Sequence, residues 1–354
     1  MPESGTYTLR EILSQPVVWQ ETLASFPSQS NDLVKFWQQS TPEQLIVTGC
    51  GSTYYLSLTA APLLQALTGV PSQARPASEL VLFPEWLFPN AERILLVTIS
   101  RSGETTETVE AVGAFRRHGG KHVLAITCDS HSTLAHSADL ILAADTAQEQ
   151  SVAQTRSFSS MALLVQAAAA HLAGQDSPRI LAPLPDIGER LLSAYYPIMR
   201  RLGESLDIDY FFFLGAGFLY GMACEAMLKL KEMSLSHSEA FHPLEFRHGP
   251  MSMVDERALV VGLVSPRAHR QEVAVLQHMH QLGAKILALG DLVSSEIISF
   301  AEVVRINSSL PDWARPVLYL PILQLLAFYR ALANGQDPDH PHNLEAVIRL
   351  KSLK

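Results

Sequence analysis

Hydroxylated side chains gather at one point where an apolar run gives way to a helical pattern. The run Ile94–Ile99 is followed by Ser100, Arg101, Ser102 and Thr105. Hydroxyls and unpaired backbone N–H groups at a helix start favour an anion, because the helix dipole is positive there. The loop has neither the paired glycines nor the lysine of a nucleoside-triphosphate loop. On these residues alone it is either an ordinary helix cap or a phosphate site.

A second stretch combines acidic, basic and imidazole side chains. On a helix, Glu225, Lys229 and Glu232 share one face, which by itself indicates a solvated surface with ion pairs. The twelve residues from His237 to His248 then carry three histidines and two glutamates. Histidine titrates near neutral pH and burial raises the pKa of a carboxyl group, so this stretch suits proton transfer. The histidine spacing matches no zinc motif, and we expect neither a metal nor a cofactor.

The composition restricts the class of protein. The 354 residues are enough for two domains, and with 47% hydrophobic and 17% charged residues they can bury large cores. A net charge of −9 without a long run of Lys or Arg argues against nucleic acid as a partner. The start of the chain has no secretory signal pattern, and the lack of about 18 uninterrupted apolar residues argues against a membrane span. Three scattered cysteines fit a reduced, cytoplasmic protein.

Short apolar runs alternate with segments of helical period, which predicts a parallel sheet with crossover helices. In the first half we expect strands at Leu45–Thr48, Ile94–Ile99, Val123–Thr127 and Leu140–Ala143, with helices at Thr53–Leu67, Thr105–His118 and Ser159–Ala173. In the second half we expect strands at Tyr210–Leu214, Leu259–Val264, Ile286–Leu289 and Val303–Ile306, with helices at Gly221–Glu232, His269–Leu282 and Pro316–Leu332. The polar, proline-containing stretch Asp176–Pro185 is expected to connect the halves.

The same landmarks recur in both halves. A glycine turn at Gly49 precedes Ser100 by 51 positions, and the turn at Gly215 precedes Ser265 by 50. A Gly-x-Lys sequence follows each of these serines at a matching distance. Such spacing indicates a duplicated domain. The second copy lacks the hydroxylated loop, because Ser265 is followed by Pro, Arg and Ala. One copy is therefore expected to bind the anion while the other supplies the chemistry.

Six motifs together point to one family. They are Gly49-Cys-Gly-Ser-Thr53, Ser100-Arg-Ser-Gly-Glu-Thr105, Ser151-Val-Ala-Gln-Thr155, Leu228-Lys-Leu-Lys-Glu232, Arg247-His-Gly-Pro250 and Asp339-His-Pro-His-Asn-Leu344. In this order, and spread over nearly the whole chain, they resemble the tandem sugar isomerase (SIS) family. That family includes the isomerase half of glucosamine-6-phosphate synthase, stand-alone glucosamine-6-phosphate deaminases and phosphosugar isomerases.

The resemblance implies an α/β protein with two tandem SIS domains. Each would be a flavodoxin-like parallel sheet flanked by helices, an α-β-α sandwich. The first domain would span residues 31–180 and the second residues 190–335. Residues 1–30 would form an N-terminal segment, and residues 336–354 a C-terminal tail near the active site.

The resemblance also implies a site, residue by residue. A phosphorylated sugar substrate would be held by Ser52, Thr53, Ser100, Arg101, Ser102, Thr105, Val152 and Gln154. The phosphate would bind the hydroxyls after Ile99 and the backbone amides around Arg101. Glu232 would move a proton between C1 and C2, with Lys229 as a further catalytic residue on the same helix. His248 would open the sugar ring from the neighbouring subunit, which implies a homodimer.

Three departures from the family pattern bear on the reaction. The chain starts at the isomerase domain and no Cys follows Met1, so we expect no glutaminase half and no ammonia made from glutamine. Where the family has a tail lysine that forms an imine with the ketose, this chain has Ala346. Gln154 replaces a serine, and Arg101 replaces a glutamine.

The missing lysine favours the direction in which the substrate brings its own nitrogen. We therefore expect a phosphosugar isomerase that acts as a deaminase or deglycase, most concretely one that converts glucosamine 6-phosphate to fructose 6-phosphate and ammonia. A simple aldose–ketose isomerase, a synthase-type isomerase domain without glutaminase, and a non-catalytic sugar-phosphate-binding module remain alternatives. Lys351 or Lys354 could replace the absent lysine if the tail shifts.

Overall fold

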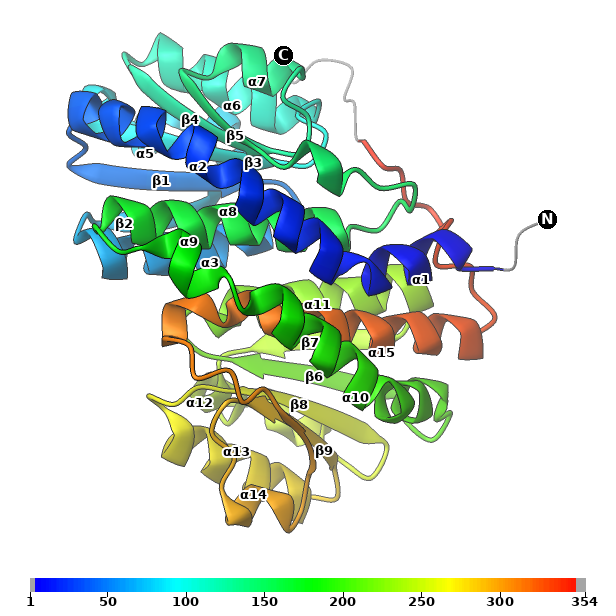
Figure 1. Cartoon of the computed structure of the whole chain (residues 1–354). Helices are drawn as coiled ribbons and strands as arrows, with labels where there is room; N and C mark the ends of the chain where they lie inside the picture. The colour runs from blue at the N-terminus through cyan, green and yellow to red at the C-terminus, as the bar shows by residue number, and fades with distance from the viewer. Residues whose placement is uncertain (1–3, 348–354) are drawn as a thin grey trace. The chain divides into compact units, whose positions relative to one another are not determined.

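Two five-stranded parallel sheets, each flanked by helices, make up the computed structural model of the protein (Figure 1). The structure describes residues 4–347. By their contacts these residues form two compact units. The N-terminal unit comprises residues 15–149, 156–183 and 345–347, and the C-terminal unit comprises residues 4–14, 150–155 and 184–344. The expected α/β class with two flavodoxin-like domains is confirmed.

The sheet of the N-terminal unit has the strand order β2-β1-β3-β4-β5, with all neighbours parallel. Its strands are β1 (Gln44–Gly49), β2 (Ser72–Pro76), β3 (Ile94–Ser100), β4 (His122–Thr127) and β5 (Leu140–Ala143). One face is covered by α2 (Gln15–Ser40), α3 (Ser52–Thr68) and α8 (Arg156–Leu172), the other by α4 (Ala77–Leu82), α6 (Thr106–Arg117) and α7 (Thr133–Ser137). The short helices α5 (Pro84–Leu87) and α9 (Ser177–Leu181) complete the unit.

Helices can pack on both faces of the sheet because successive side chains of each strand point to opposite faces. Ile46 and Leu96 pack in a buried cluster with Phe115 of α6. Their neighbours Leu45 and Leu95 instead line a small apolar gap with residues of α2, α3 and α8. Both faces are buried, so the strands are continuous apolar runs, which is why the sequence predicts them.

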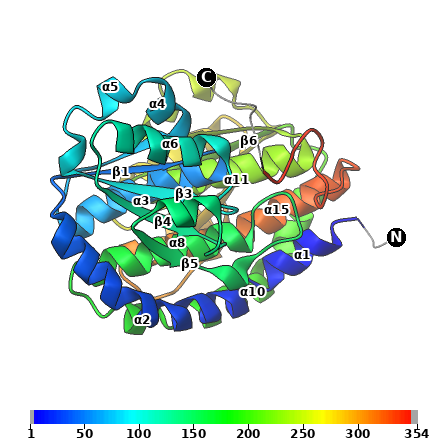
Figure 2. The same cartoon turned by 90° about the horizontal axis from the view of Figure 1, so that it is seen from above.

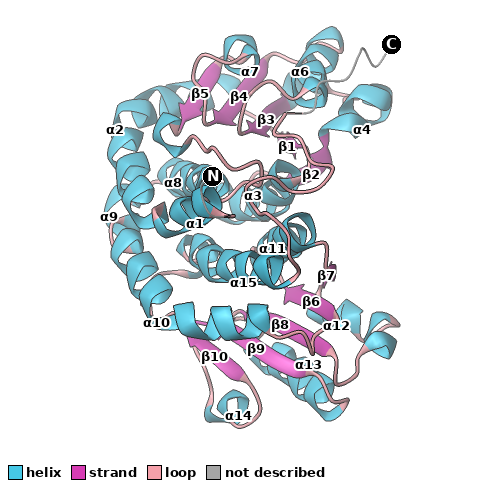
Figure 3. Cartoon of the chain, turned by 90° about the vertical axis from the view of Figure 1, so that its right-hand side faces the viewer, coloured by secondary structure: helices cyan, strands magenta, loops and turns pink. Residues whose placement is uncertain are grey.

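The C-terminal unit repeats this topology with the strand order β7-β6-β8-β9-β10. Its strands are β6 (Tyr210–Gly215), β7 (His237–Phe241), β8 (Ala258–Val264), β9 (Lys285–Gly290) and β10 (Glu302–Arg305). Helices α10 (Leu184–Glu204), α11 (Leu219–Ser234) and α15 (Leu320–Ala333) lie on one side, and α12 (Pro243–Phe246), α13 (His269–Gln281) and α14 (Ser295–Ile298) on the other (Figure 3). The N-terminal helix α1 (Thr6–Leu13) packs on α15. The shared topology agrees with the duplication expected from sequence spacing.

Some elements differ from the sequence-based expectation. Strands β2 and β7 were not predicted; both are edge strands whose polar residues break the apolar pattern. Helix α2, a long blue helix in Figure 2, was also missed. The expected connection Asp176–Pro185 holds α9 and the start of α10, because the Asp176 side chain caps α9 by accepting a hydrogen bond from the Arg179 amide.

One stretch in the described part of the chain, Pro316–Ala333, is long and apolar enough to cross a membrane. In the structure 89% of it is buried, and α15 packs against α10 and α11. Burial of this kind is typical of the central helix of a folded domain, which is apolar all round.

Candidate active site

Two loops meet at the carboxyl edge of the N-terminal sheet. β1 and β3 are hydrogen-bonded neighbours. After β1 the chain continues to β2 on one side of this pair, and after β3 it continues to β4 on the other side. In open parallel sheets ligands bind at such a switch point, beside the N-termini of the helices that follow. The structure brings to this point the expected substrate contacts Ser52, Thr53, Ser100, Arg101, Ser102 and Thr105.

The hydroxyls of residues 100–105, the hydroxyl loop, are oriented by the loop's own amides. Ser100 Oγ accepts a hydrogen bond from Gly103 N at 3.1 Å, and Ser102 Oγ accepts one from Glu104 N at 3.2 Å. In these bonds each serine uses its oxygen, which leaves the hydroxyl proton for an anion. Thr105 is the N-cap of α6, but its side chain makes no capping hydrogen bond. The side chain of Thr105 therefore does not act as an ordinary helix cap, which was one of the two interpretations of this loop.

A neighbouring segment fixes the shape of the hydroxyl loop. Gly103 has a φ of +62°, and a Cβ there would lie 2.0 Å from Ser132 Oγ. Gly103 O accepts a hydrogen bond from Leu134 N at 2.9 Å. The Glu104 carboxylate accepts bonds from Thr133 N at 2.7 Å and Thr133 Oγ1 at 3.0 Å. The loop is thus pre-shaped, which lowers the entropic cost of binding a ligand.

In the loop after β1, the Thr53 hydroxyl is hydrogen-bonded to the main chain of Cys50. It donates to Cys50 O at 2.9 Å and accepts from Cys50 N at 3.0 Å. Gly49 permits this arrangement, since a Cβ there would lie 2.5 Å from Thr53 Oγ1. Thr53 and Ser52 are only 3% and 5% exposed. A substrate group that meets the Thr53 hydroxyl would therefore have to be a donor.

The matching position of the C-terminal unit is filled by the protein's own carboxylate. Ser265 N donates to Glu272 Oε2 at 2.7 Å, and the Ser265 hydroxyl lies 3.1 Å from both carboxylate oxygens. Burial raises the pKa of Glu272 to about 7, although the Ser265 hydrogen bonds oppose this rise. In the C-terminal unit, the donors at the position that matches the hydroxyl loop are thus occupied by Glu272.

Most of the charged face of helix α11 is buried. The sequence alone allowed two interpretations of this face, a solvated surface or a catalytic group. The side chains of Glu225 and Lys229 are 0% and 1% exposed, and Glu232 is 17% exposed. Lys229 Nζ lies 3.4 Å from Glu225 Oε1 and is hydrogen-bonded to Glu232 Oε2. A solvated face is excluded for Glu225 and Lys229. The ammonium ion fixes the position of the Glu232 carboxylate at the edge of the buried face.

The histidines of the second stretch have different surroundings. His242 stacks on Tyr220 with ring centroids 3.8 Å apart, and burial lowers the pKa of the imidazole while Glu245 partly opposes this. His248 follows the short helix α12 and is exposed. Among the described residues no group of three or more His, Cys, Asp or Glu side chains could hold a metal ion.

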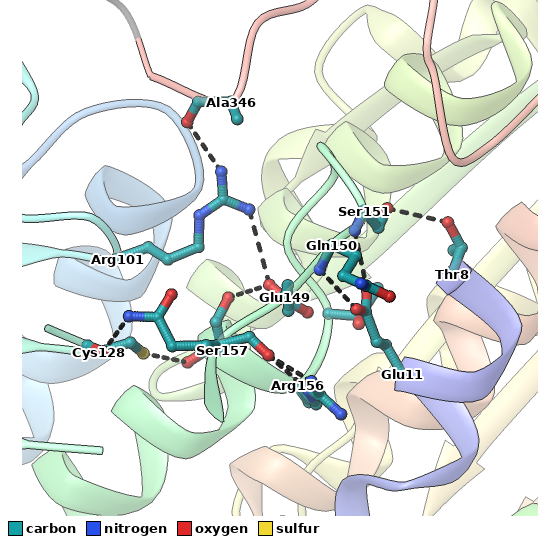
Figure 4. Close-up of polar contacts among 12 residues, drawn as sticks. Thr8, Glu11, Arg101, Cys128, Glu149, Gln150, Ser151, Arg156, Ser157 and Ala346 are labelled. Carbon is teal, nitrogen blue, oxygen red and sulfur yellow. Dashed lines mark hydrogen bonds and ion pairs between the residues drawn. The ribbon is translucent and has the colours of Figure 1, made fainter. Parts of the chain in front are cut away.

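Helix α1 anchors the loop that carries Val152 and Gln154. The Glu11 side chain, 0% exposed, accepts hydrogen bonds from Gln150 N at 2.6 Å and Ser151 N at 3.2 Å (Figure 4). Gln154 Oε1 is buried and has no hydrogen-bond partner among the described residues. Sequence reasoning missed Glu11, because a glutamate in an ordinary helix gives no local sign of a distant backbone partner.

The tail is held at two places. In the C-terminal unit the Asp339 carboxylate caps α1, accepting from Tyr7 N at 3.0 Å and Thr8 N at 2.7 Å. In the N-terminal unit Ala346 O accepts a hydrogen bond from Arg101. Lys351 and Lys354, the candidate replacements for the missing lysine, lie outside the described residues.

The expected site residues are distributed over both units. The contacts at the switch point belong to the N-terminal unit, whereas Val152, Gln154, Lys229, Glu232 and His248 belong to the C-terminal unit. Within the C-terminal unit the structure joins Lys229 and Glu232 directly.

Comparison with known proteins adds to this geometry. The SIS domain family matches the chain twice, over residues 40–171 and 208–333. The glutamine–fructose-6-phosphate aminotransferase (isomerizing) of Methanothermobacter thermautotrophicus is 27% identical over 356 residues. This alignment covers 99% of the chain but only 59% of the relative, so the chain spans little more than half the length of such curated relatives.

Two solved structures are similar over nearly their whole length. Tagatose-6-phosphate ketose/aldose isomerase from Escherichia coli is 25% identical with a TM-score of 0.85, covering 96% of this chain and 97% of that one. Glucosamine-6-phosphate deaminase from Thermotoga maritima is 28% identical with a TM-score of 0.73, covering 93% and 99%. All three relatives bear the names of enzymes of phosphorylated sugars.

Proposed function

Because the chain belongs to the SIS-domain family, we propose that it is a phosphosugar enzyme that deaminates a hexosamine phosphate. The proposed reaction converts glucosamine 6-phosphate and water to fructose 6-phosphate and ammonia. The observation that carries the proposal is the buried Lys229 bound to Glu232, which presents a fixed carboxylate for proton transfer. An aldose–ketose shift needs such a base beside two adjacent carbons.

In this proposal the substrate phosphate binds the hydroxyl loop. The protons of Ser100 and Ser102, the Thr105 hydroxyl and the backbone amides around Arg101 are the donors, at the start of α6 where the helix dipole favours an anion. Binding energy from the phosphate, which does not react, can then be used to hold the reacting carbons at the base.

The chemistry follows from the remaining residues. His248 gives a proton to the ring oxygen while the C1 hydroxyl loses its proton to water, which opens the sugar to the C1 aldehyde. Glu232 removes the proton from C2, the electron pair forms a C1–C2 double bond, and the C1 oxygen takes a proton from water. Glu232 then returns its proton to C1, and the nitrogen electron pair forms a protonated imine at C2. Water adds to C2 and passes one proton to the nitrogen. The C–N bond breaks with its electron pair leaving on nitrogen, the remaining hydroxyl at C2 loses its proton to become the ketone, and ammonia is released. The imine carries the substrate's own nitrogen, so no enzyme lysine is needed at Ala346.

Gln154 supports recognition of a polar substituent on the sugar. Its buried Oε1 lacks a partner among the described residues, and a buried acceptor without a hydrogen bond is costly. We propose that a substrate N–H or O–H donates to it, with Val152 as the adjacent apolar contact. This glutamine stands where the family has a serine, so it is a candidate determinant of which sugar is accepted.

A second candidate is a simple aldose–ketose isomerase. The TM-score of 0.85 with the E. coli tagatose-6-phosphate isomerase favours it, because the same base and ring-opening histidine would serve that reaction. A binding module without catalysis is the third candidate. Neither the base nor the ring-opening histidine would be needed in that case.

The test is a screen of phosphorylated amino sugars and hexose phosphates with ammonia and ketose measured together. We expect ammonia and fructose 6-phosphate in equal amounts from glucosamine 6-phosphate. Ketose formed from an aldose phosphate, with no ammonia from any amino sugar, would instead establish the isomerase. Tight binding with no turnover of any substrate would establish the binding module.

We also propose a cytoplasmic homodimer in which His248 serves the site of the neighbouring subunit. The exposure of His248 supports this arrangement, because a catalytic histidine left open to solvent can be completed by a second chain.

A further inference from the structure

The side chain of Arg101 leaves the hydroxyl loop and reaches the C-terminal tail. Its Nη2 donates a hydrogen bond to Ala346 O at 2.8 Å, and its Nη1 lies 3.6 Å from Glu149 Oε2 (Figure 4). Arg101 is only 9% exposed, and the Glu149 side chain is fully buried. The guanidinium is therefore held by protein groups and not left in solvent.

We propose that Arg101 is a positioning residue that holds the tail segment, residues 345–347, at the hydroxyl loop, and that its side chain is not a ligand of the phosphate. The inference rests on the proposed function only in taking the hydroxyl loop as the phosphate site. The contact joins two positions that depart from the family pattern, Arg101 in place of glutamine and Ala346 in place of lysine.

Glu149 explains why the guanidinium points to the tail. A buried carboxylate needs a cation or hydrogen-bond donors, and Glu149 receives both from Arg101 and the Ser157 hydroxyl. A guanidinium held on one side by a carboxylate presents its other N–H groups in a fixed direction. One of them meets the carbonyl of Ala346.

The tail segment has little secondary structure to hold it. Ala346 is exposed and lies in neither a helix nor a strand. A hydrogen bond from a charged donor is about twice as strong as a neutral one. The bond from Arg101 is therefore an effective restraint on these residues.

The main chain of Arg101 is fixed independently of its side chain. Its carbonyl oxygen accepts hydrogen bonds from Cys128 N at 3.1 Å and Thr127 Oγ1 at 3.3 Å. Shortening the side chain should therefore leave the hydroxyls of the loop in place. Mutation can separate the restraint on the tail from the binding of phosphate.

Cleavage of the full chain after Glu345 by a glutamate-specific protease, followed by mass spectrometry, tests the restraint, because a held segment is cut more slowly than a free one. Arg101→Gln and Arg101→Lys are compared with Arg156→Gln, a matched control in which the arginine also donates to a main-chain oxygen, that of Gln148. We expect Arg101→Gln to speed cleavage after Glu345 by about tenfold, since a charge-assisted bond is lost. Lysine keeps the charge beside Glu149 without the fork, so Arg101→Lys should fold normally and still free the tail. Unchanged cleavage in both Arg101 variants would overturn the proposal.

Titration with inorganic phosphate tests whether the Arg101 side chain restrains the tail or binds the phosphate. We expect Arg101→Gln to keep the phosphate affinity of the parent within about threefold, whereas Ser100→Ala, which loses a hydroxyl donor, falls by about tenfold or more. If Arg101→Gln loses as much affinity as Ser100→Ala, the guanidinium is a phosphate ligand and the positioning role is wrong.

Failure of the proposed function has a different signature. A parent protein that converts no sugar phosphate refutes the function, and cleavage after Glu345 in the parent and in Arg101→Gln still decides the role of Arg101. With an active parent, we expect Arg101→Gln to lower kcat more than it raises KM, because the tail and not the phosphate contact is released. An active parent with unchanged cleavage after Glu345 in Arg101→Gln refutes the restraint alone.

Discussion

Lys229 carries a charge in a buried environment. Its ammonium group is 1% exposed and lies between the carboxylates of Glu225 and Glu232, the first of which is fully buried. Taking charges out of water is costly, and removal of one partner leaves the other uncompensated. Lys229 therefore links the stability of α11 to the placement of the proposed base.

Replacing Lys229 by Met should destabilise the protein by about 3–5 kcal/mol, because Glu225 is left buried without its cation. Lys231→Met is the matched control, since Lys231 lies on the same helix but is exposed, and it should cost at most about 0.5 kcal/mol. Denaturant unfolding of both variants, followed by circular dichroism, measures the difference. Equal losses would mean that the buried ion pairs do not contribute as argued.

Glu232→Gln tests the base. The substitution keeps the shape of the side chain but removes the group that accepts a proton, so kcat should fall by about a thousandfold or more. Affinity for inorganic phosphate should stay within about twofold, since the hydroxyl loop is unchanged. Steady-state kinetics and phosphate titration give the two numbers, and retained turnover would refute the role.

At the scale of elements, both copies use the same strand-to-helix turn for opposite purposes. In the N-terminal unit the turn after β3 leaves hydroxyl protons for a ligand, whereas after β8 Ser265 binds the carboxylate of Glu272. In the proposed function one copy of the duplicated element binds an external anion, and in the other the carboxyl group of Glu272 takes that place.

Gly103→Ala should distort the hydroxyl loop. Besides the positive φ of +62°, the new Cβ would lie 2.0 Å from Ser132 Oγ. Gly119→Ala is a matched control, because Gly119 also has a positive φ, +89°, but open space around its Cβ. The control should cost about 1 kcal/mol and Gly103→Ala about 1–3 kcal/mol more. Only Gly103→Ala should also weaken phosphate binding; a loss in both variants would contradict the role of the loop's shape.

Glu272 predicts a pH-dependent stability. Its folded-state pKa is raised from the ordinary 4.5 to about 7, so between these values the unfolded chain releases a proton that the folded chain retains. Its contribution is fully present below pH 4.5 and is lost as the pH rises to 7. The free energy of unfolding of Glu272→Gln, measured relative to that of the parent, should therefore rise by on the order of 3 kcal/mol between pH 4 and pH 8. Unfolding midpoints at several pH values measure this gain, and a constant difference would contradict it.

At the scale of the whole molecule, the proposed exchange of His248 between subunits can be tested by complementation. Glu232→Gln and His248→Ala chains should each be nearly inactive alone. Mixed and reassociated in equal amounts, they form mixed dimers in which one of two sites has both groups, so about a quarter of the parent activity should return. Mixtures that stay inactive while dimers exchange would show that His248 acts within its own chain.

Local signals in the sequence determined the repeated α/β framework. Continuous apolar runs predict strands buried on both faces, and β3 with the hydroxyl loop after it stands where expected. The edge strands β2 and β7 escaped prediction, because an edge strand needs no apolar run. The order of turns also determined the duplication, since matching spacings in one chain give matching crossovers.

Tertiary structure alone decided which polar residues are buried and with which partners. The face of α11 has the same sequence pattern whether solvent or other elements cover it, and only tertiary packing buries Glu225 and Lys229. Arg101 finds its acceptor in Ala346, 245 positions along the chain. Sequence periodicity reports on neighbours within a few residues, whereas such pairs form only when the folded backbone brings distant segments together.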